Sequence, residues 1–196
     1  MLGIGYSDVA PGQIATVVTH LEMTTKPSPM PVPADLGLEL VRHETPDPDW
    51  YRALFRKVGE DWLWCSRLRM DQAELARVLT RPGSEIYAVE EAGDAVGLLE
   101  LQFNNPDEAE ISFFGLAPQA IGRGAGRWLM AQALQKCWGR GISRLWVQTC
   151  TLDSPQALGF YQAMGFKPYR RRVEVISDPR LDGTLARDAA PHVPVI

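Results

Sequence analysis

The stretch that decides the fold runs from Phe113 to Trp138 and reads FFGLAPQAIGRGAGRWLMAQALQKCW. From Gly126 onward, small or apolar residues recur at i, i+3, i+4, i+7, i+8 and i+11, which predicts an amphipathic helix that ends at the glycines at 139 and 141. The residues before it, from Ala109 to Leu116, predict a strand. Glycines at 122, 124 and 126 join strand to helix, so the chain turns tightly directly before a helix N-terminus.

A glycine-rich turn of this kind can bind an anion. The first N–H groups of the helix point outward at the positive end of its dipole, and Arg123 and Arg127 would add charge-assisted contacts to a pyrophosphate. A dinucleotide-binding GxGxxG loop would need a glycine where Arg127 stands, and the Gly-Lys-Ser/Thr of a Walker loop is absent. The alternative is that the glycines form only a loop and a close-packed helix start.

The flanking segments predict a mixed α/β fold. Helices are expected after the N-caps Asp47 and Asp71, and another is expected from an N-cap at Ser154 to Met164. Expected strands are 37–43, the three-stranded antiparallel meander 85–90, 95–103 and 109–116, and then 144–150 and 167–176. The order β-α-α-β-β-β-α-β-α-β places a strand-helix-strand crossover after the meander.

The chain of 196 residues divides into three expected parts. Residues 1–37 hold a peripheral strand at 14–23 and a proline-rich, extended linker at 26–33. Residues 38–178 form the catalytic domain, and residues 179–196 form an irregular tail.

Composition limits the classes of function. No window is apolar enough to span a membrane, the N-terminus lacks the pattern of a secretory signal, and three unpaired cysteines suit a reducing compartment, so we expect a cytoplasmic protein. Residues 111–172 hold nine basic residues and one acid, a charge of +8, whereas the whole chain carries −4. This asymmetry favours a localised polyanionic ligand, such as a phosphorylated cofactor, over long nucleic acid.

Two motifs in order resemble those of the GNAT acyltransferase superfamily. Gln119-Ala-Ile-Gly-Arg-Gly-Ala-Gly126 is similar to its Q/R-x-x-G-x-G/A motif, and residues 154–166 are similar to its Asn-x-x-Ala-x-x-x-Tyr-x-x-x-Gly-Phe signature, with Ser154 in place of asparagine. The resemblance implies a mostly antiparallel sheet flanked by helices and splayed at a bulge, which we place at 114–116, and acetyl-CoA as co-substrate. The residues it implies for acetyl-CoA binding are Leu116, Gln119, Gly122, Arg123, Gly124, Ala125, Gly126, Arg127, Ser154 and Phe160.

The same resemblance suggests the catalytic groups. Tyr161 aligns with the tyrosine that protonates the departing thiolate of CoA, although its helical spacing also suits a core aromatic. An N–H at or near Leu116 would stabilise the oxyanion. Glu110, expected on one face of its strand with Ser112 and Phe114, is the candidate base; it could equally be a solvated glutamate near a turn, and Glu100 is the runner-up.

The acceptor is expected to be a small-molecule or peptide amine. The segment 61–69 is where the family often builds its acceptor pocket, and its Trp62, Trp64, Arg67 and Arg69 could receive an aromatic or carboxylate-bearing amine or could serve packing. Arg170, Arg171 and Arg172 could meet the 3′-phosphate of CoA or form a solvated face. We expect no metal, nucleic-acid or membrane partner, and a homodimer stays open. The rival reading is a non-catalytic acyl-CoA-binding or regulatory module.

Overall fold

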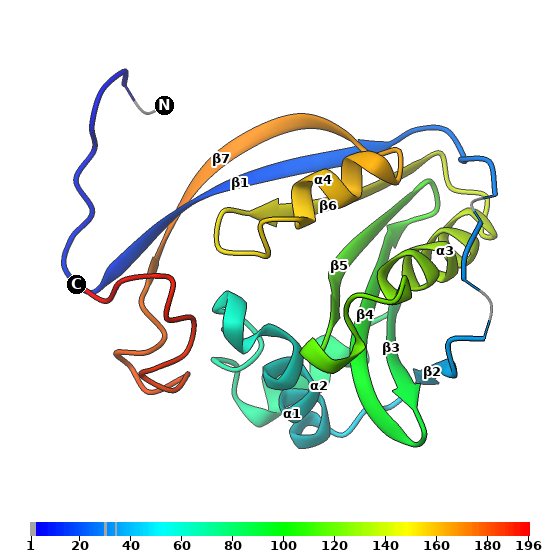
Figure 1. Ribbon diagram of the computed structural model, residues 1–196, viewed down its shortest axis with the longest axis horizontal. Helices are drawn as coiled ribbons and strands as arrows, with labels where there is room; N and C mark the ends of the chain where they lie inside the picture. The colour runs from blue at the N-terminus through cyan, green and yellow to red at the C-terminus, as the bar shows by residue number, and fades with distance from the viewer. Residues whose placement is uncertain (1–2, 30, 34) are drawn as a thin grey trace.

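A computed structural model describes residues 3–29, 31–33 and 35–196. Its framework is one sheet of seven strands in the order β2-β3-β4-β5-β6-β1-β7 (Figure 1). All neighbouring pairs are antiparallel except β5 and β6, which are parallel. The strands are β1 (Gln13–Met23), β2 (Leu38–His43), β3 (Ser84–Glu91), β4 (Asp94–Asn105), β5 (Glu108–Leu116), β6 (Arg144–Cys150) and β7 (Lys167–Ser177).

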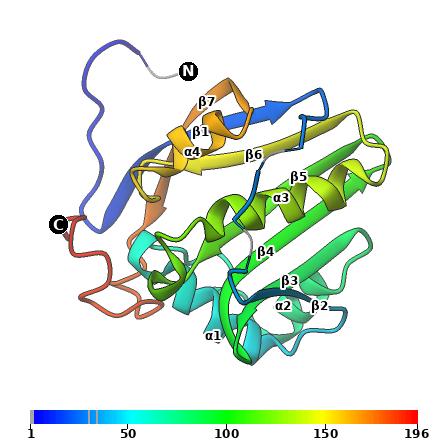
Figure 2. The same cartoon turned by 45° about the vertical axis from the view of Figure 1, so that its right-hand side comes forward.

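Helices cover both faces of the sheet and confirm the mixed α/β prediction. The α-helices are α1 (Pro48–Gly59), α2 (Gln72–Leu79), α3 (Ala125–Trp138) and α4 (Ala157–Ala163), and two 3₁₀ turns are η1 (Glu60–Trp62) and η2 (Pro118–Ala120). One core forms where α1 and α2 pack on one face, around Tyr51, Phe55 and Leu98. The other core forms where α3 and α4 pack on the opposite face, around Leu129, Leu134 and Tyr161; Figure 2 shows α3 lying along the sheet.

Local signals set the helix starts of α1 and α2 as predicted. The carboxylate of Asp47 accepts hydrogen bonds from the N–H groups of Asp49 (3.0 Å) and Trp50 (2.9 Å), and Asp71 accepts one from Glu74 N–H (2.8 Å). Such caps satisfy N–H groups that have no partner inside the helix. The meander of β3, β4 and β5 and the crossover through α3 are also confirmed.

Strand β1 was expected at the periphery, and this expectation is wrong. It lies inside the sheet, antiparallel to β6 on one side and to β7 on the other (Figure 1). Its alternating burial places Ile14, Thr16 and Val18 on the buried face, and its pairing with both β6 and β7 gives it an interior position. Of the predicted linker that follows, residues 30 and 34 lie outside the described residues.

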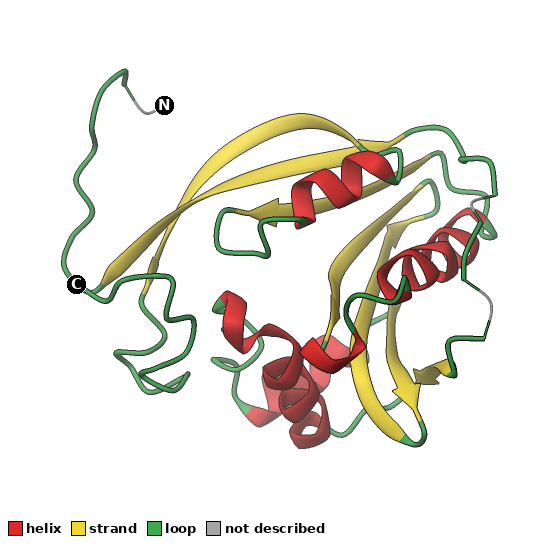
Figure 3. Ribbon diagram, in the orientation of Figure 1, coloured by secondary structure: helices red, strands yellow, loops and turns green. Residues whose placement is uncertain are grey.

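The bulge that we expected at 114–116 lies earlier in β5. Glu100 of β4 faces Phe113 and Leu101 faces Ile111, so Ser112 is the extra residue. Gly115 remains paired with Leu98, and its missing side chain serves packing, because a Cβ there would stand 2.5 Å from Val58 Cγ1. The bulge bends β5 where it leaves β6: the two strands pair only up to Ile111 and Val147 and then diverge (Figure 3).

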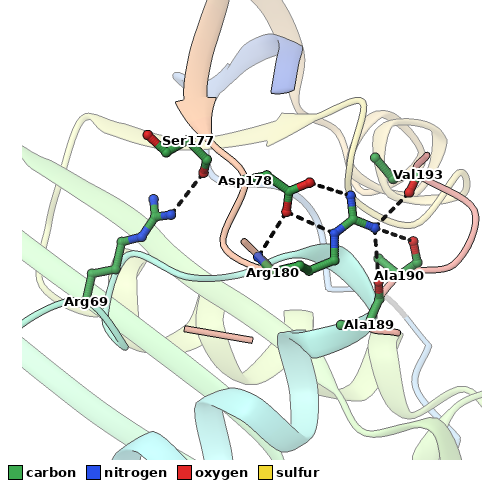
Figure 4. Close-up of polar contacts among 7 residues, drawn as sticks. All are labelled: Arg69, Ser177, Asp178, Arg180, Ala189, Ala190 and Val193. Carbon is green, nitrogen blue, oxygen red and sulfur yellow. Dashed lines mark hydrogen bonds and ion pairs between the residues drawn. The ribbon is translucent and has the colours of Figure 1, made fainter. Parts of the chain in front are cut away.

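The tail after β7 is irregular, as predicted, yet it is firmly attached (Figure 3). Arg180 is 4% exposed and pairs with Asp178, which is 2% exposed. The same guanidinium donates to the carbonyl oxygens of Ala189, Ala190 and Val193, and so closes the tail into a loop (Figure 4). Buried charges are tolerated only when they are paired and hydrogen-bonded in this way.

Candidate active site

A cavity of about 530 Å³ opens where β5 and β6 diverge. Phe160 and Tyr161 line it from the side of α3 and α4, whereas Val58 and Trp64 line it from the side of α1. Because residues from both faces contribute, the cavity passes between the splayed strands. Two ligands that approach from opposite faces could therefore meet in it.

The glycine turn lies at the α3 end of this cavity. Gly122 and Gly124 have φ values of +96° and +86°, which side chains rarely adopt, and Gly124 is the N-cap of α3. Gly126 follows in ordinary helical geometry and lines the cavity. The Pro33 ring packs against this turn, since a Cβ at Gly124 would stand 2.5 Å from Pro33 Cγ, so the segment before β2 covers part of the N-terminus of α3.

The predicted acetyl-CoA ligands fall into two groups. Four of the predicted residues line the cavity: Leu116, Gly126, Ser154 and Phe160. The others lie in the connection from β5 to α3 outside the lining: Gln119, Gly122, Arg123, Gly124, Ala125 and Arg127. Ala125 is buried, Arg127 is exposed, and Arg123 forms an ion pair with Glu91 at 2.7 Å, so its charge is partly engaged.

Ser154 differs from its predicted role as a helix cap. The N-cap of α4 is Gln156, and its side chain makes no capping hydrogen bond. Ser154 instead lies in the preceding turn, where its carbonyl oxygen accepts from Ala157 N–H (2.8 Å). The Ser154 hydroxyl also accepts a long hydrogen bond from Gln156 N–H (3.4 Å), so the serine–proline pair starts the turn rather than the helix.

Tyr161 lies in an aromatic wall of the cavity. Its ring centroid is 5.6 Å from that of Phe160, 6.1 Å from Phe114 and 6.0 Å from Phe166, and the side chain is 6% exposed. Burial, with a smaller contribution from the Asp153 carboxylate, raises the pKa of the Tyr161 phenol well above its usual value. The phenol therefore keeps its proton at neutral pH, as a proton donor must.

Asp153 is a site residue that the sequence did not single out. It follows β6 and lines the cavity, where its carboxylate accepts from Trp64 Nε1 (3.1 Å), Thr149 Oγ1 (2.8 Å) and Cys150 N–H (2.9 Å). The only sequence signal for it is an acidic residue in a turn immediately after a buried strand. Asp153 ties the turn after β6 to the segment between α1 and α2.

Trp64 fills the wall that this bond stabilises. A Cβ at Gly59 would stand 2.4 Å from Trp64 Cδ2, and one at Gly115 would stand 3.1 Å from its Cη2, so both glycines make room for the indole. Trp62 and Arg69 line the cavity, as the acceptor-pocket prediction required, but Arg67 does not.

Arg67 instead belongs to a buried cluster with Glu100 and Tyr51. Glu100 is fully buried and accepts from Tyr51 Oη (2.7 Å) and from Arg67 Nη2 (2.5 Å). The runner-up base is therefore held as an ion pair behind the cavity wall. Desolvation first, and then the charge of Glu100, raise the pKa of the Tyr51 phenol.

Glu110 does not share a face with Phe114, because the bulge at Ser112 changes the alternation of β5. Glu110 faces Gln102 and Phe113 faces Glu100, which places Glu110 and Phe113 on the α1 side and Phe114 on the α3 side. Glu110 stands outside the cavity lining, next to Ser112, which is part of it. Burial raises the pKa of the Glu110 carboxyl, and a hydrogen bond from Ser112 opposes this shift.

The carboxylates among the described residues that line the cavity are those of Asp153 and Glu174. Arg170, Arg171 and Arg172 lie on the exposed edge strand β7, outside the lining. Within the described ranges, no cluster of three His, Cys, Asp or Glu side chains could hold a metal ion. In the same ranges, no helix has the length and apolar character needed to cross a membrane.

A model of one protein family matches more than half of the chain. The sequence model described as "Acetyltransferase (GNAT) family" matches residues 45–166. No curated protein matches the chain.

Solved structures show the same fold at low identity. A GNAT-family protein of Novosphingobium aromaticivorans is 18% identical with a TM-score of 0.54, over 85% of this chain and 68% of that one. A GCN5-related N-acetyltransferase of Sphaerobacter thermophilus is 12% identical with a TM-score of 0.63, over 83% of this chain but 51% of that one, so this chain spans about half its length. A GNAT acetyltransferase of Elizabethkingia anophelis, solved with acetyl-CoA bound, is 19% identical with a TM-score of 0.53, over 69% and 80%.

Proposed function

We propose, because the chain belongs to the GNAT family of acetyltransferases, that it transfers an acetyl group from acetyl-CoA to a primary amine by direct attack in a ternary complex. The observation that carries this proposal is the cavity between β5 and β6, which residues from both faces of the sheet line. It allows the thioester to enter from the side of α3 while the amine enters from the side of α1. The three free cysteines suit a reducing compartment, and we place the activity in the cytoplasm.

The glycine turn is the proposed site for the pyrophosphate of acetyl-CoA. Gly126 lines the cavity, has no side chain to obstruct a ligand, and lies in the first turn of α3, where backbone N–H groups lack partners inside the helix. Arg127 is exposed beside the turn and can add a charged contact. The co-substrate brings an activated acetyl group as its thioester.

Tyr161 is the proposed acid. When the amine attacks the carbonyl carbon, the C–N bond forms, and the carbonyl oxygen takes negative charge that a backbone N–H near Leu116 would stabilise. The C–S bond then breaks, and the phenol of Tyr161 gives its proton to the thiolate. Its raised pKa means that the phenol still carries its proton at neutral pH when the thiolate departs.

Glu110 is the proposed base, acting through Ser112. The amine arrives as an ammonium and must lose a proton before it can attack. Ser112 lines the cavity and neighbours Glu110, so its hydroxyl can pass the proton to a carboxylate that burial has made more basic than usual. Asp153 is a poorer candidate because three hydrogen-bond donors already occupy it.

The test is acetyl-CoA-dependent thiol release by the full chain over a panel of amino acids, polyamines, aminoglycosides and peptide N-termini. Release with at least one amine, above the rate without amine, supports acetyl transfer. Stabilisation by acetyl-CoA without release for any amine would contradict it and indicate a CoA-binding module instead.

A further inference from the structure

The acceptor end of the cavity carries a carboxylate that the proposed mechanism does not use. Glu174 of β7 lines the cavity together with Ile176, the next residue on the same strand face. Val173 and Val175, on the opposite face, are about half exposed. Among the described residues, no hydrogen bond or ion pair engages the side chain of Glu174.

The arginines that could receive a carboxylate-bearing amine are already paired. Arg67 is bound to Glu100 behind the wall. Arg69 lines the cavity, but its Nη2 donates to Asp182 Oδ2 at 2.6 Å and to the carbonyl oxygen of Ser177 at 2.9 Å (Figure 4 shows the Ser177 contact). The Asp182 carboxylate, which belongs to the tail, offsets the charge of Arg69 and so weakens its attraction for an acceptor carboxylate.

The charge that remains at the acceptor end is negative. Arg69 and Asp182 balance each other, which leaves Glu174 and, deeper in the cavity, Asp153. Arg172 lies on the same face of β7 as Glu174 but does not line the cavity. Burial lowers the pKa of His20, and the charges of Arg170 and Arg172 lower it further.

The wall between these charges is apolar. Trp62, Leu63, Leu152 and Ile176 line it, and Leu63 and Leu152 pack against Leu185 and Ala190 of the tail. An elongated molecule with an apolar middle fits such a wall, and a cationic end fits Glu174.

We propose that the acceptor is a diamine or a similar elongated amine with a second cationic group, and that Glu174 binds this distal cation while the primary amine reaches the reaction centre. This inference rests on the proposed function, because it names the substrate class of the same cavity. The contact is an ion pair at a partly open site, so its loss should weaken binding by up to about fivefold.

The experiment measures binding and turnover separately with the full chain. Putrescine and cadaverine, the monoamines of the same lengths, and the aminocarboxylate of matching length are titrated calorimetrically into the CoA-loaded protein. The wild type is compared with Glu174→Gln and with Glu39→Gln, a matched loss of charge on the exposed face of β2 at the other edge of the sheet.

We expect the wild type and Glu39→Gln to bind the diamines about fivefold more tightly than the monoamines, and Glu174→Gln to lose this preference. The proposal is overturned if no diamine binds, if Glu174→Gln keeps the preference, or if the aminocarboxylate binds best.

Thiol release with acetyl-CoA in the same samples separates this proposal from the proposed function. Diamine binding that depends on Glu174 but gives no thiol release would support the cation site and contradict acetyl transfer. Thiol release with the same KM for monoamines and diamines would support acetyl transfer and overturn the cation site.

Discussion

Trp64 Nε1 donates a hydrogen bond to Asp153 Oδ1 across the mouth of the splayed strands, at 3.1 Å. The indole comes from the segment between α1 and α2 and the carboxylate from the turn after β6, so one bond joins the two sides of the cavity. The charge of the same carboxylate also raises the pKa of the Tyr161 phenol, after the larger effect of burial. The wall of the acceptor pocket and the environment of the proposed acid therefore depend on one contact.

Trp64→Phe should loosen this wall without unfolding the protein. The phenyl ring fills only part of the space of the indole, whereas Asp153 retains two donors, so the expected loss is about 1–3 kcal/mol in the free energy of unfolding. The KM for the amine should rise several-fold while acetyl-CoA affinity stays unchanged, as initial rates and calorimetry can show. Trp138→Phe is the control, because Trp138 lies outside the cavity lining and no hydrogen bond to its indole is found among the described residues; an equal effect there would contradict this interpretation.

Gly126→Val should block acetyl-CoA. A Cβ at Gly126 meets only Phe160, at 3.7 Å, so the helix can accept a side chain, whereas that side chain would occupy the proposed path of the co-substrate. The rise in Tm that acetyl-CoA causes should disappear. Gly159→Val in α4, where a Cβ meets open space, should keep it. A normal rise in the folded Gly126→Val protein would remove the co-substrate from this turn.

Tyr161→Phe should separate acid catalysis from packing. No hydrogen bond to the hydroxyl is found within the described part of the chain, so the phenylalanine fits the same aromatic wall. Turnover should fall by roughly 10²-fold, the scale of one acid–base group, with unchanged Tm and acetyl-CoA affinity. Full turnover in the variant would leave Tyr161 with a packing role only.

Glu110→Gln should reduce kcat/KM at neutral pH, and the deficit should shrink as pH rises and the amine loses its proton in solution. Pre-steady-state pH profiles of this variant and of Ser112→Ala test the proposed relay, since both should show the same change. If Ser112→Ala is unaffected while Glu110→Gln is impaired, the proton travels by another route.

The same carboxyl makes a prediction for stability. The pKa of Glu110 is raised in the folded state, so folded protein binds its proton more tightly than unfolded protein, and acidification through the raised pKa stabilises the wild type. Glu110→Gln lacks this gain. Urea denaturation measures the free energy of unfolding of both proteins. Relative to the wild type, the variant should be most stable at neutral pH and should become progressively less stable as the pH falls toward the unfolded-state pKa.

Arg180→Met should destabilise the protein by about 3–5 kcal/mol, because it leaves the buried carboxylate of Asp178 without its partner. Arg180 also holds the pKa of Asp178 below its usual value, so the part of the stability that comes from this pair is lost as pH falls through that lowered pKa. Urea denaturation measures both effects. Arg187→Met, on the exposed side of the same tail, should change little; equal losses would argue against the buried pair.

Sequence patterns predicted the elements of the fold because those patterns are local. The caps at Asp47 and Asp71 and the apolar spacing of α3 act within a few residues, and the structure has each of them. The position of β1 in the sheet could not be predicted in this way. Its alternating sequence indicates which face of the strand is buried but not which strands lie beside it.

The residues of the candidate site that belong to a sequence motif could be predicted. Those that contacts between distant parts of the chain bring into the site could not. Tyr161 and Gly126 line the cavity as expected. The face of Glu110 depended on one extra residue, Ser112, and a bulge has no fixed sequence signal, so the alternation predicted the wrong neighbour. Asp153 joined the site through Trp64, which is 89 positions away, and Arg69 was neutralised by the tail.

The interior position of β1 has a consequence for the order of folding. Thr16 and Thr151, whose hydroxyls are 2.8 Å apart, are 135 positions apart in sequence. During synthesis at about 5–20 residues per second, β1 would wait roughly 10 s before β6 exists to pair with it. The half of the sheet that carries β6, β1 and β7 must therefore form late and at a high cost in loop closure, so we expect the α1-to-β5 segment to become structured first and slow docking of β1 to limit the folding rate.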